Sequence, residues 1–115
     1  MTNDYQNGEI VNVDFGLPKE VTGYVQEMER PCLIIKVLYE LQLAIIIPCT
    51  AKIPKHNYYS ILKLTKGTAN LKKNSFLLCH QIRTISLDRI VEKIGTLGEE
   101  DFRKVKGVLL DVLEM

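Results

Sequence analysis

The stretch CLIIKVLYELQLAIII, residues 32–47, decides the fold class. It contains two runs rich in β-branched residues and leucine, Cys32 to Val37 and Leu41 to Ile47, and each run has the length of one strand. Tyr39 and Glu40 leave room between them for only a short turn, so we expect the two runs to pair as a buried hairpin. Pro48 follows, and we expect the second strand to stop there because proline cannot donate to a ladder.

Further strand-length segments lie on both sides of this hairpin. Alternating apolar and polar residues predict a half-buried strand over residues 10–15, and residues 58–64, 75–85 and 91–97 predict three more. Residues 86–90 predict a single turn. From Glu99 onward apolar residues recur at spacings of three and four behind an acidic first turn, which predicts an amphipathic helix. Several short strands and one terminal helix are typical of a small curled sheet or barrel covered on one side, so the class is mainly β or α+β.

Length and composition indicate one ordinary globular domain. A chain of 115 residues has room for one hydrophobic core, and 46% hydrophobic with 25% charged residues is too apolar for a disordered chain. We expect residues 1–7 to form a flexible N-terminal segment. No apolar run approaches the roughly 20 residues of a membrane span, the N-terminus lacks the pattern of a secretory signal, and the three cysteines lie in apolar stretches. These features predict a cytoplasmic protein with buried, reduced thiols and no zinc site.

The formal net charge of +1 conceals a segregation of charge along the chain. Residues 41–87 carry no acidic residue but hold seven cations, which are Lys52, Lys55, Lys63, Lys66, Lys72, Lys73 and Arg83. Such a segment can give a positive face that attracts polyanions, although scattered lysines on solvated loops would have the same composition.

The segment SFLLCHQIRTISLDRIVEKIGTLGEEDFRKV, Ser75 to Val105, resembles the C-terminal third of MazF/PemK toxins. In that family a strand ending in Q-I-R-T-I precedes an I-G-T-L element and an acidic helix start. Arg30-Pro31 opening a strand and Pro48-Cys49-Thr50 closing the next are similar as well, so the resemblance runs from about Gly8 to the end. It implies an SH3-like barrel of the CcdB/PemK type with a C-terminal helix, usually a homodimer, and a sequence-specific endoribonuclease that cleaves single-stranded mRNA and inhibits growth.

The resemblance also implies the catalytic residues. The family's catalytic arginine and threonine match Arg30 and Thr50. In such enzymes the 2′-hydroxyl of the RNA attacks the adjacent phosphorus and leaves 2′,3′-cyclic phosphate and 5′-hydroxyl ends, with no metal or other cofactor. An arginine fork and a threonine hydroxyl suit the charge of the phosphorane. His80 stands where a PemK-type member carries an acidic residue proposed as the base, and a histidine can move protons near neutral pH. A histidine that only packs or binds substrate is the alternative.

Residues expected to bind RNA surround these three. Lysines would follow the RNA backbone and an exposed tyrosine would stack on a base, although Tyr58 can also be an ordinary strand aromatic. Arg83 and Thr84 are expected to support the site from an interior strand. The same basic surface would admit an acidic, MazE-like antitoxin. The full RNA-binding set is Gln26, Lys52, Lys55, Tyr58, Lys72, Lys73 and Gln81.

Two rival functions stay open. The family pattern E-Q-x-G-x-R-P reads Val25-Gln26-Glu27-Met28-Glu29-Arg30-Pro31 here, and the loop from Gly16 to Glu29 is longer by a few residues. A degenerate toxin that kept its fold and lost its activity would explain that departure. A CcdB-like toxin directed at DNA gyrase would share the fold and act by binding, without cleaving RNA.

Overall fold

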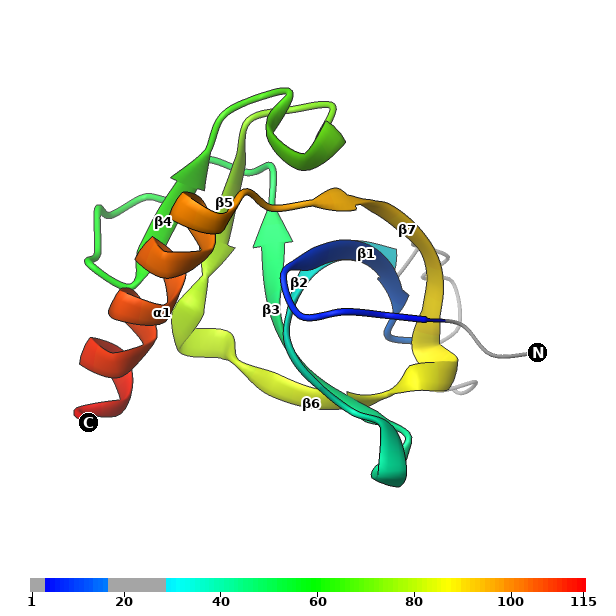
Figure 1. Ribbon diagram of the computed structural model, residues 1–115. Coiled ribbons are helices and arrows are strands. Elements are labelled where there is room, and N and C mark those ends of the chain that lie inside the picture. Colours follow the sequence, from blue (N-terminus) through cyan, green and yellow to red (C-terminus); the bar gives the residue numbers. More distant parts are fainter. Residues whose placement is uncertain (1–3, 17–28) are drawn as a thin grey trace.

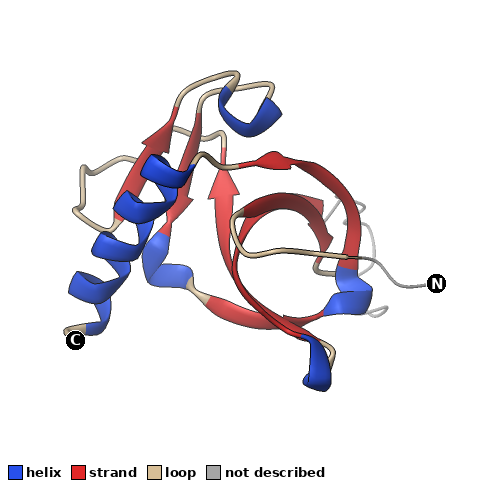
Figure 2. Ribbon diagram, viewed as in Figure 1, coloured by secondary structure: helices blue, strands red, loops and turns tan. Residues whose placement is uncertain are grey.

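A computed structural model describes residues 4–16 and 29–115. This part of the chain holds seven strands, four short 3-10 turns and one α-helix (Figure 1). The 3-10 turns stand at corners between consecutive strands (Figure 2). In chain order the elements are β1 (Glu9–Asp14), β2 (Glu29–Leu38), η1 (Tyr39–Leu41), β3 (Leu43–Thr50), β4 (Ile61–Leu64), η2 (Thr68–Asn70), β5 (Ser75–Leu78), η3 (Cys79–Gln81), β6 (Arg83–Ser86), η4 (Leu87–Arg89), β7 (Ile90–Thr96) and α1 (Glu99–Leu113).

The strands form one curled antiparallel sheet. Their order is β4-β5-β3-β2-β1-β7, and β6 pairs with β3 beside β5. The expected hairpin is confirmed as β2 and β3, in which Leu33 pairs with Ile47 and Val37 with Ala44. The expected mainly β fold, a small curled sheet with a C-terminal helix, is confirmed, and the barrel does not close by backbone pairing, because no pairing within the described part of the chain joins β7 to β6 or β4. The sheet curls around β1 instead and stays open (Figure 1).

The single strand expected over residues 75–85 is not formed, because the chain breaks at η3. Cys49 pairs with Leu77, whereas Ile46, three residues earlier on β3, pairs with Arg83, six residues further along. Three residues are therefore looped out between β5 and β6, and they form η3.

Pro48 does not end β3, which continues to Thr50. Pro48 pairs with Cys32 of β2, but its other side falls in the gap between the residues that pair with β5 and β6. One edge of β3 therefore makes no ladder bonds at Pro48, and proline is tolerated at such an edge. The strand expected from Tyr58 starts only at Ile61, because the backbone N–H of Ile61 donates to the carbonyl of Tyr58 in a turn.

Two hydrophobic clusters lie on opposite faces of the sheet. One lies beneath α1 and includes Leu33, Ile47, Val105 and Leu109. The other fills the inside of the curl, and its members include Tyr5, Val11, Val13, Cys32, Ile34, Ile46 and Ile85. Strands β2 and β3 contribute to both clusters, which explains why their sequences are almost continuously apolar rather than alternating.

Helix α1 confirms the expected amphipathic pattern. Val105 and Leu109 are buried against the sheet, and Glu99, Glu100 and Asp101 stand in the first turn. Carboxylates there interact favourably with the positive end of the helix dipole. Among the described residues, no helix is long and apolar enough to cross a membrane.

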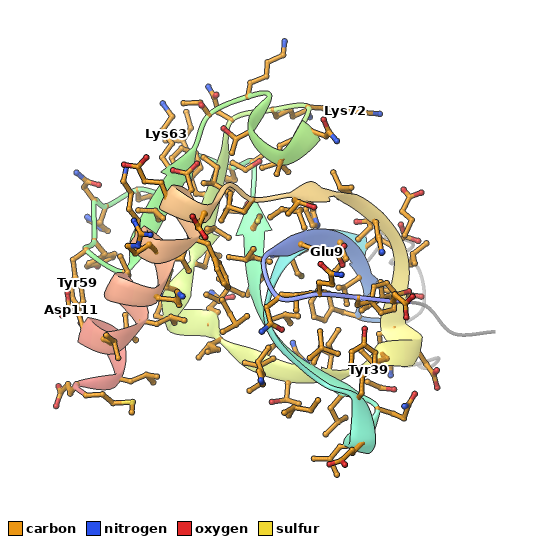
Figure 3. The ribbon with its side chains drawn as sticks, in the orientation of Figure 1. Glu9, Tyr39, Tyr59, Lys63, Lys72 and Asp111 are labelled. Atoms are coloured by element: carbon orange, nitrogen blue, oxygen red, sulfur yellow. The ribbon has the colours of Figure 1, made fainter. Side chains whose placement is uncertain are left out.

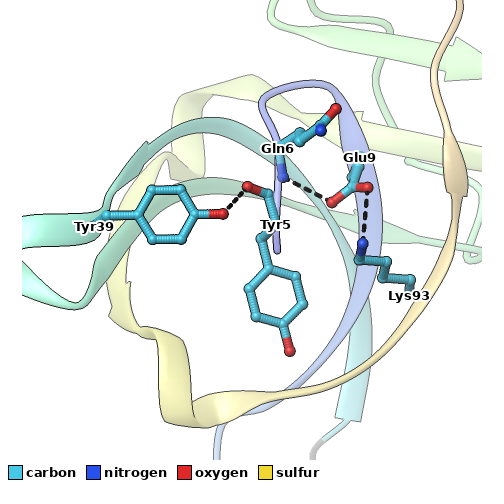
Figure 4. Close-up of polar contacts among 5 residues, drawn as sticks. All are labelled: Tyr5, Gln6, Glu9, Tyr39 and Lys93. Atoms are coloured by element: carbon cyan, nitrogen blue, oxygen red, sulfur yellow. Dashed lines mark hydrogen bonds and ion pairs between the residues drawn. The ribbon is translucent and has the colours of Figure 1, made fainter. Parts of the chain in front are cut away.

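The packed part of the N-terminus begins earlier in the chain than expected. Residues 1–3 lie outside the described part, but the side chain of Tyr5 is only 6% exposed within the inner cluster. The hydroxyl of Tyr39 donates to the carbonyl of Tyr5, and the side chain of Asn7 accepts from the backbone of Val37 at 3.0 Å. Glu9 accepts from the backbone of Gln6 at 2.8 Å (Figure 4). Tyr5, Gln6 and Asn7 are therefore held against the strands by these contacts, within the segment 1–7 that was expected to be flexible.

Candidate functional site

The start of β2 and the end of β3 lie on neighbouring strands of the sheet. Cys32 pairs with Pro48, and Arg30 and Thr50 lie two residues beyond that pair on their own strands. Arg30 is exposed and Thr50 is half-buried. Each lines a pocket of its own, so their joint catalytic role stays a prediction.

Arg30 lines a small depression that we call the arginine pocket, formed by Phe15, Arg30, Pro48, Gln81 and Arg83, with a volume of about 150 Å³. The guanidinium of Arg83 lies over the ring of Phe15, 4.8 Å from its centroid, and this cation–π contact fixes its position. Two guanidinium groups and one amide line the pocket, and none of its described residues carries a carboxylate. Such a site suits a phosphate group.

The positive charges of this pocket act on the buried thiol of Cys32. Burial raises the pKa of the Cys32 thiol to about 12, although the positive charges of Arg30 and Arg83 act to lower it. Both guanidinium groups are therefore close enough to Cys32 to influence one buried group between them. Burial also raises the pKa of Cys79 to about 11 and that of Cys49 further. The three cysteines are free and buried, as expected from their apolar surroundings, and protonated thiols of this kind are poor nucleophiles.

Thr50 lines a second and larger depression, which we call the threonine pocket, with a volume of about 300 Å³. The backbone N–H of Lys52 donates to Oγ1 of Thr50 at 3.1 Å. Because that bond uses an acceptor position of the hydroxyl, its proton is still available to a phosphate oxygen. Lys72 and Lys73 line the same pocket and are exposed, and Lys72 extends outward at the end of the molecule near η2 (Figure 3).

His80 lies elsewhere. It is an exposed residue of η3, and its Nδ1 is 2.9 Å from the hydroxyl oxygen of Ser60, which is almost buried beside β4. His80 lines neither the arginine pocket nor the threonine pocket, although its neighbour Gln81 lines the first. The structure therefore does not bring His80 together with Arg30 and Thr50, and its catalytic role stays a prediction.

Substitution of His80 by glutamine decides between proton transfer and packing. If His80 carries a proton in catalysis, His80→Gln should lower kcat by about a hundredfold or more. Because the ring is hydrogen-bonded to Ser60 and does not line the arginine pocket, we expect kcat to stay within about tenfold. His56→Gln, in an exposed loop, is the matched control.

The remaining expected RNA-binding residues occupy a separate loop. Lys55 lines a third depression together with His56 and Lys63, and the ring of Tyr58 lies 5.7 Å from that of His56. Tyr58 is 57% exposed, so a face of its ring is open to a ligand. Lys63 points outward near β4 (Figure 3). These placements agree with a solvated basic surface, but RNA binding by it stays a prediction. Gln26 lies outside the described residues.

The polar residues of the Q-I-R-T-I motif lie on the surface, whereas its last residue, Ile85, is buried. Gln81, Arg83 and Thr84 are all exposed, because β6 is short and one of its edges is unpaired within the described chain. Gln81 and Arg83 contribute directly to the arginine pocket. Thr84 points into a neighbouring depression with Ser86 and Arg89. Arg83, which was expected to support the site, thus lines the pocket itself.

Sequence reasoning missed the residues that shape both pockets. Phe15 was read only as a strand residue, yet it holds Arg83. Asn12 and Glu92 were passed over, although they lie side by side on β1 and β7 and both line the threonine pocket. The only feature of the sequence that could have indicated Asn12 was its polar position in a strand of alternating apolar and polar residues. Within residues 4–16 and 29–115, no group of three or more His, Cys, Asp or Glu residues is placed to hold a metal ion.

Known proteins resemble this chain over most of its length. The family model described as PemK-like, MazF-like toxin of type II toxin-antitoxin system matches residues 6–113. A search of curated protein sequences gives no significant match. Among solved structures, MazF from a Deinococcus radiodurans MazE–MazF complex superposes with a TM-score of 0.74 at 20% identity, covering 96% of this chain and 97% of that one. The Mycobacterium tuberculosis toxin MazF-mt6 gives 0.73 at 15% identity, covering 93% and 97%. A mycobacterial endoribonuclease in complex with its cognate antitoxin gives 0.73 at 12% identity, covering 97% of each chain.

Proposed function

Because the chain belongs to the PemK-like, MazF-like toxin family of type II toxin-antitoxin systems, we propose that it is an endoribonuclease that cleaves single-stranded messenger RNA and thereby inhibits growth. The observation that carries the proposal is the arginine pocket, in which Arg30 and Arg83 line one depression together with Pro48, two residues before Thr50 on β3. Solved relatives named as an endoribonuclease and as a toxin share the fold, which agrees with this function.

Arg30 and Arg83 would stabilise the charge that develops on phosphorus. When the 2′-hydroxyl attacks, the non-bridging oxygens gain negative charge in the phosphorane. A guanidinium donates two parallel N–H groups to two such oxygens, and Gln81 adds a further donor at the same pocket. Donors that are already oriented stabilise a transition state without reorganising at the moment of reaction.

The hydroxyl of Thr50 would donate a hydrogen bond to an oxygen of the same phosphorane, since its Oγ1 already accepts one from the backbone N–H of Lys52. During the step the bond between O2′ and phosphorus forms and the bond between phosphorus and O5′ breaks. The proton of the 2′-hydroxyl leaves, and one proton is delivered to the departing 5′-oxygen. The products carry a 2′,3′-cyclic phosphate and a 5′-hydroxyl. This reaction needs no metal or covalent enzyme intermediate.

The basic surface around the site would hold the RNA backbone and the partner. Lys52, Lys55, Lys72 and Lys73 are exposed, so RNA affinity should fall with salt at a slope of about −0.7 per phosphate neutralised. An acidic, MazE-like antitoxin would inhibit by covering the same surface. We further propose a homodimer, and action on messenger RNA would place the protein in the cytoplasm.

The test is cleavage of a long single-stranded RNA by the purified protein in EDTA, followed by analysis of the new ends. We expect cuts at a short motif with 5′-hydroxyl and cyclic phosphate ends. An otherwise identical RNA with a 2′-deoxy sugar at the cut should resist cleavage, because its nucleophile is missing. Intact RNA at high protein concentration would contradict the proposal, and it would point to a toxin that acts by binding or has lost its activity.

A further inference from the structure

One side of the threonine pocket is a row of three residues on neighbouring strands. Asn12 of β1 pairs with Pro31 of β2 on one side and with Glu92 of β7 on the other, and all three line the pocket. Apolar side chains complete its walls, among them Leu71 and Ile94. Its volume of about 300 Å³ lies at the lower end of small-ligand pockets, which suits one nucleobase and excludes a duplex.

Three side chains of this pocket donate hydrogen bonds within the protein. The amide nitrogen of Asn12 donates to Glu29 at 2.7 Å, and that of Asn70 donates to the carbonyl of Ile94 at 3.0 Å. The hydroxyl of Ser75 donates to the carbonyl of Lys73 at 3.0 Å.

The acceptor oxygens are left for a ligand. They are the side-chain carbonyls of Asn12 and Asn70 and the carboxylate of Glu92. Within the described part of the chain, no hydrogen bond or ion pair holds the Glu92 carboxylate, whereas the neighbouring Lys93 pairs with Glu9 at 3.4 Å. The pocket therefore presents these acceptors to its contents, beside the donors of Thr50, Lys72 and Lys73.

We infer that the threonine pocket takes one unpaired base of the RNA beside the cleaved phosphate, and that Glu92 and Asn12 make guanine the preferred base. Guanine carries its N1–H and N2 amino donors side by side, so one carboxylate can accept both. Adenine and cytosine place an acceptor next to their amino group, and uracil offers a single N–H between two carbonyls, which a carboxylate repels. Reading of a splayed-out base through its Watson–Crick edge is typical of single-stranded RNA recognition.

Position and charge make RNA a better occupant than an acidic peptide. Thr50, which is proposed to contact the phosphorane, lines the pocket itself, so a base there belongs to a nucleotide at or next to the cut. Lys72 and Lys73 at the same pocket can bind the adjoining phosphate, whereas the exposed Glu92 that also lines it would repel an acidic side chain. The inference rests on the proposed RNA-cleaving function and adds base selection to it.

Binding of short, non-cleavable RNA separates this inference from the proposed function. Labelled 2′-O-methyl pentanucleotides of uridine, with guanosine, adenosine, cytidine or uridine at the centre, would be titrated with the protein and followed by fluorescence anisotropy. Wild type should bind the guanosine oligonucleotide about ten- to a hundredfold more tightly than the uridine one. Glu92→Gln should reduce that ratio to about two, because its amide replaces one acceptor with a donor. Glu100→Gln on α1 is the matched control and should leave the ratio unchanged.

Either a ratio near one in the wild type or a ratio that survives in Glu92→Gln would overturn the inference. Loss of binding to all four oligonucleotides in Glu92→Gln would overturn it too, since it would assign Glu92 to the fold rather than to base selection. If guanosine is preferred but wild type cleaves no RNA, the pocket stands and the proposed function fails. If RNA is cleaved with no preference for guanosine beside the cut, the proposed function stands and the pocket assignment fails.

Discussion

Arg30→Ala is expected to lower kcat for RNA cleavage by about a hundred- to a thousandfold, the usual effect of removing one oriented donor from a developing oxyanion. Arg30 is exposed at the start of β2 and lines the arginine pocket, so truncation removes charge from the site without opening a cavity in the core. Single-turnover rates on a short RNA with a known cut would measure it. Thr50→Ala should cost less, because it removes a neutral donor, and neutral hydrogen bonds are weaker than charged ones.

Two further variants separate charge, geometry and folding. Arg30→Lys keeps the charge but not the planar fork, so we expect only partial recovery of the rate. Arg103→Ala removes an exposed arginine of α1, far along the chain from the pocket, and should cleave as fast as wild type. Thermal melting should be the same for all of them. Cleavage by Arg30→Ala within tenfold of wild type would remove Arg30 from the mechanism.

The strands and the helix could be predicted from the sequence because apolar patterning is local. The β2–β3 hairpin and α1 follow from runs and spacings that any chain must bury. The break at η3 could not be predicted, because residues 75–85 are uniformly strand-like and only the separate pairing of β5 and β6 with β3 requires it. Pro48 was misjudged for the same reason, since the free edge beside it exists only in the assembled sheet.

The site was predicted in part, through a motif rather than through physics. Arg30 and Thr50 were marked by family resemblance, and each lines a pocket near the paired ends of β2 and β3, while their catalytic role stays a prediction. His80 was marked by its neighbours in the chain, yet a turn directs it toward Ser60. Asn12 and Glu92 are far apart in sequence, and only the pairing of β1 with β7 makes them neighbours.

One wall of the threonine pocket depends on a glycine on β7. A Cβ built on Gly95 would lie 2.6 Å from the carbonyl carbon of Ala69 in η2 and closer still to its oxygen. The side chain of Asn70 donates to the carbonyl of Ile94 at 3.0 Å, so η2 is fastened against β7 at this point. Because the atoms nearest to that Cβ belong to the backbone of Ala69, rotation of a side chain cannot make room for a methyl group.

Gly95→Ala is therefore expected to lower the free energy of unfolding by about 2–3 kcal/mol, in the upper range for overpacking, and Tm by about 10 °C. Chemical denaturation and thermal melting would measure it. Gly107→Ala on α1 is the matched control: a Cβ there meets nothing within 4 Å, and alanine in place of glycine inside a helix should raise stability by about 0.5–1 kcal/mol. The same substitution thus has opposite signs at two glycines. A Gly95→Ala protein as stable as wild type would show that η2 can move away from β7, and the pocket wall formed by Asn70, Leu71 and Lys72 would then not be fixed by this contact.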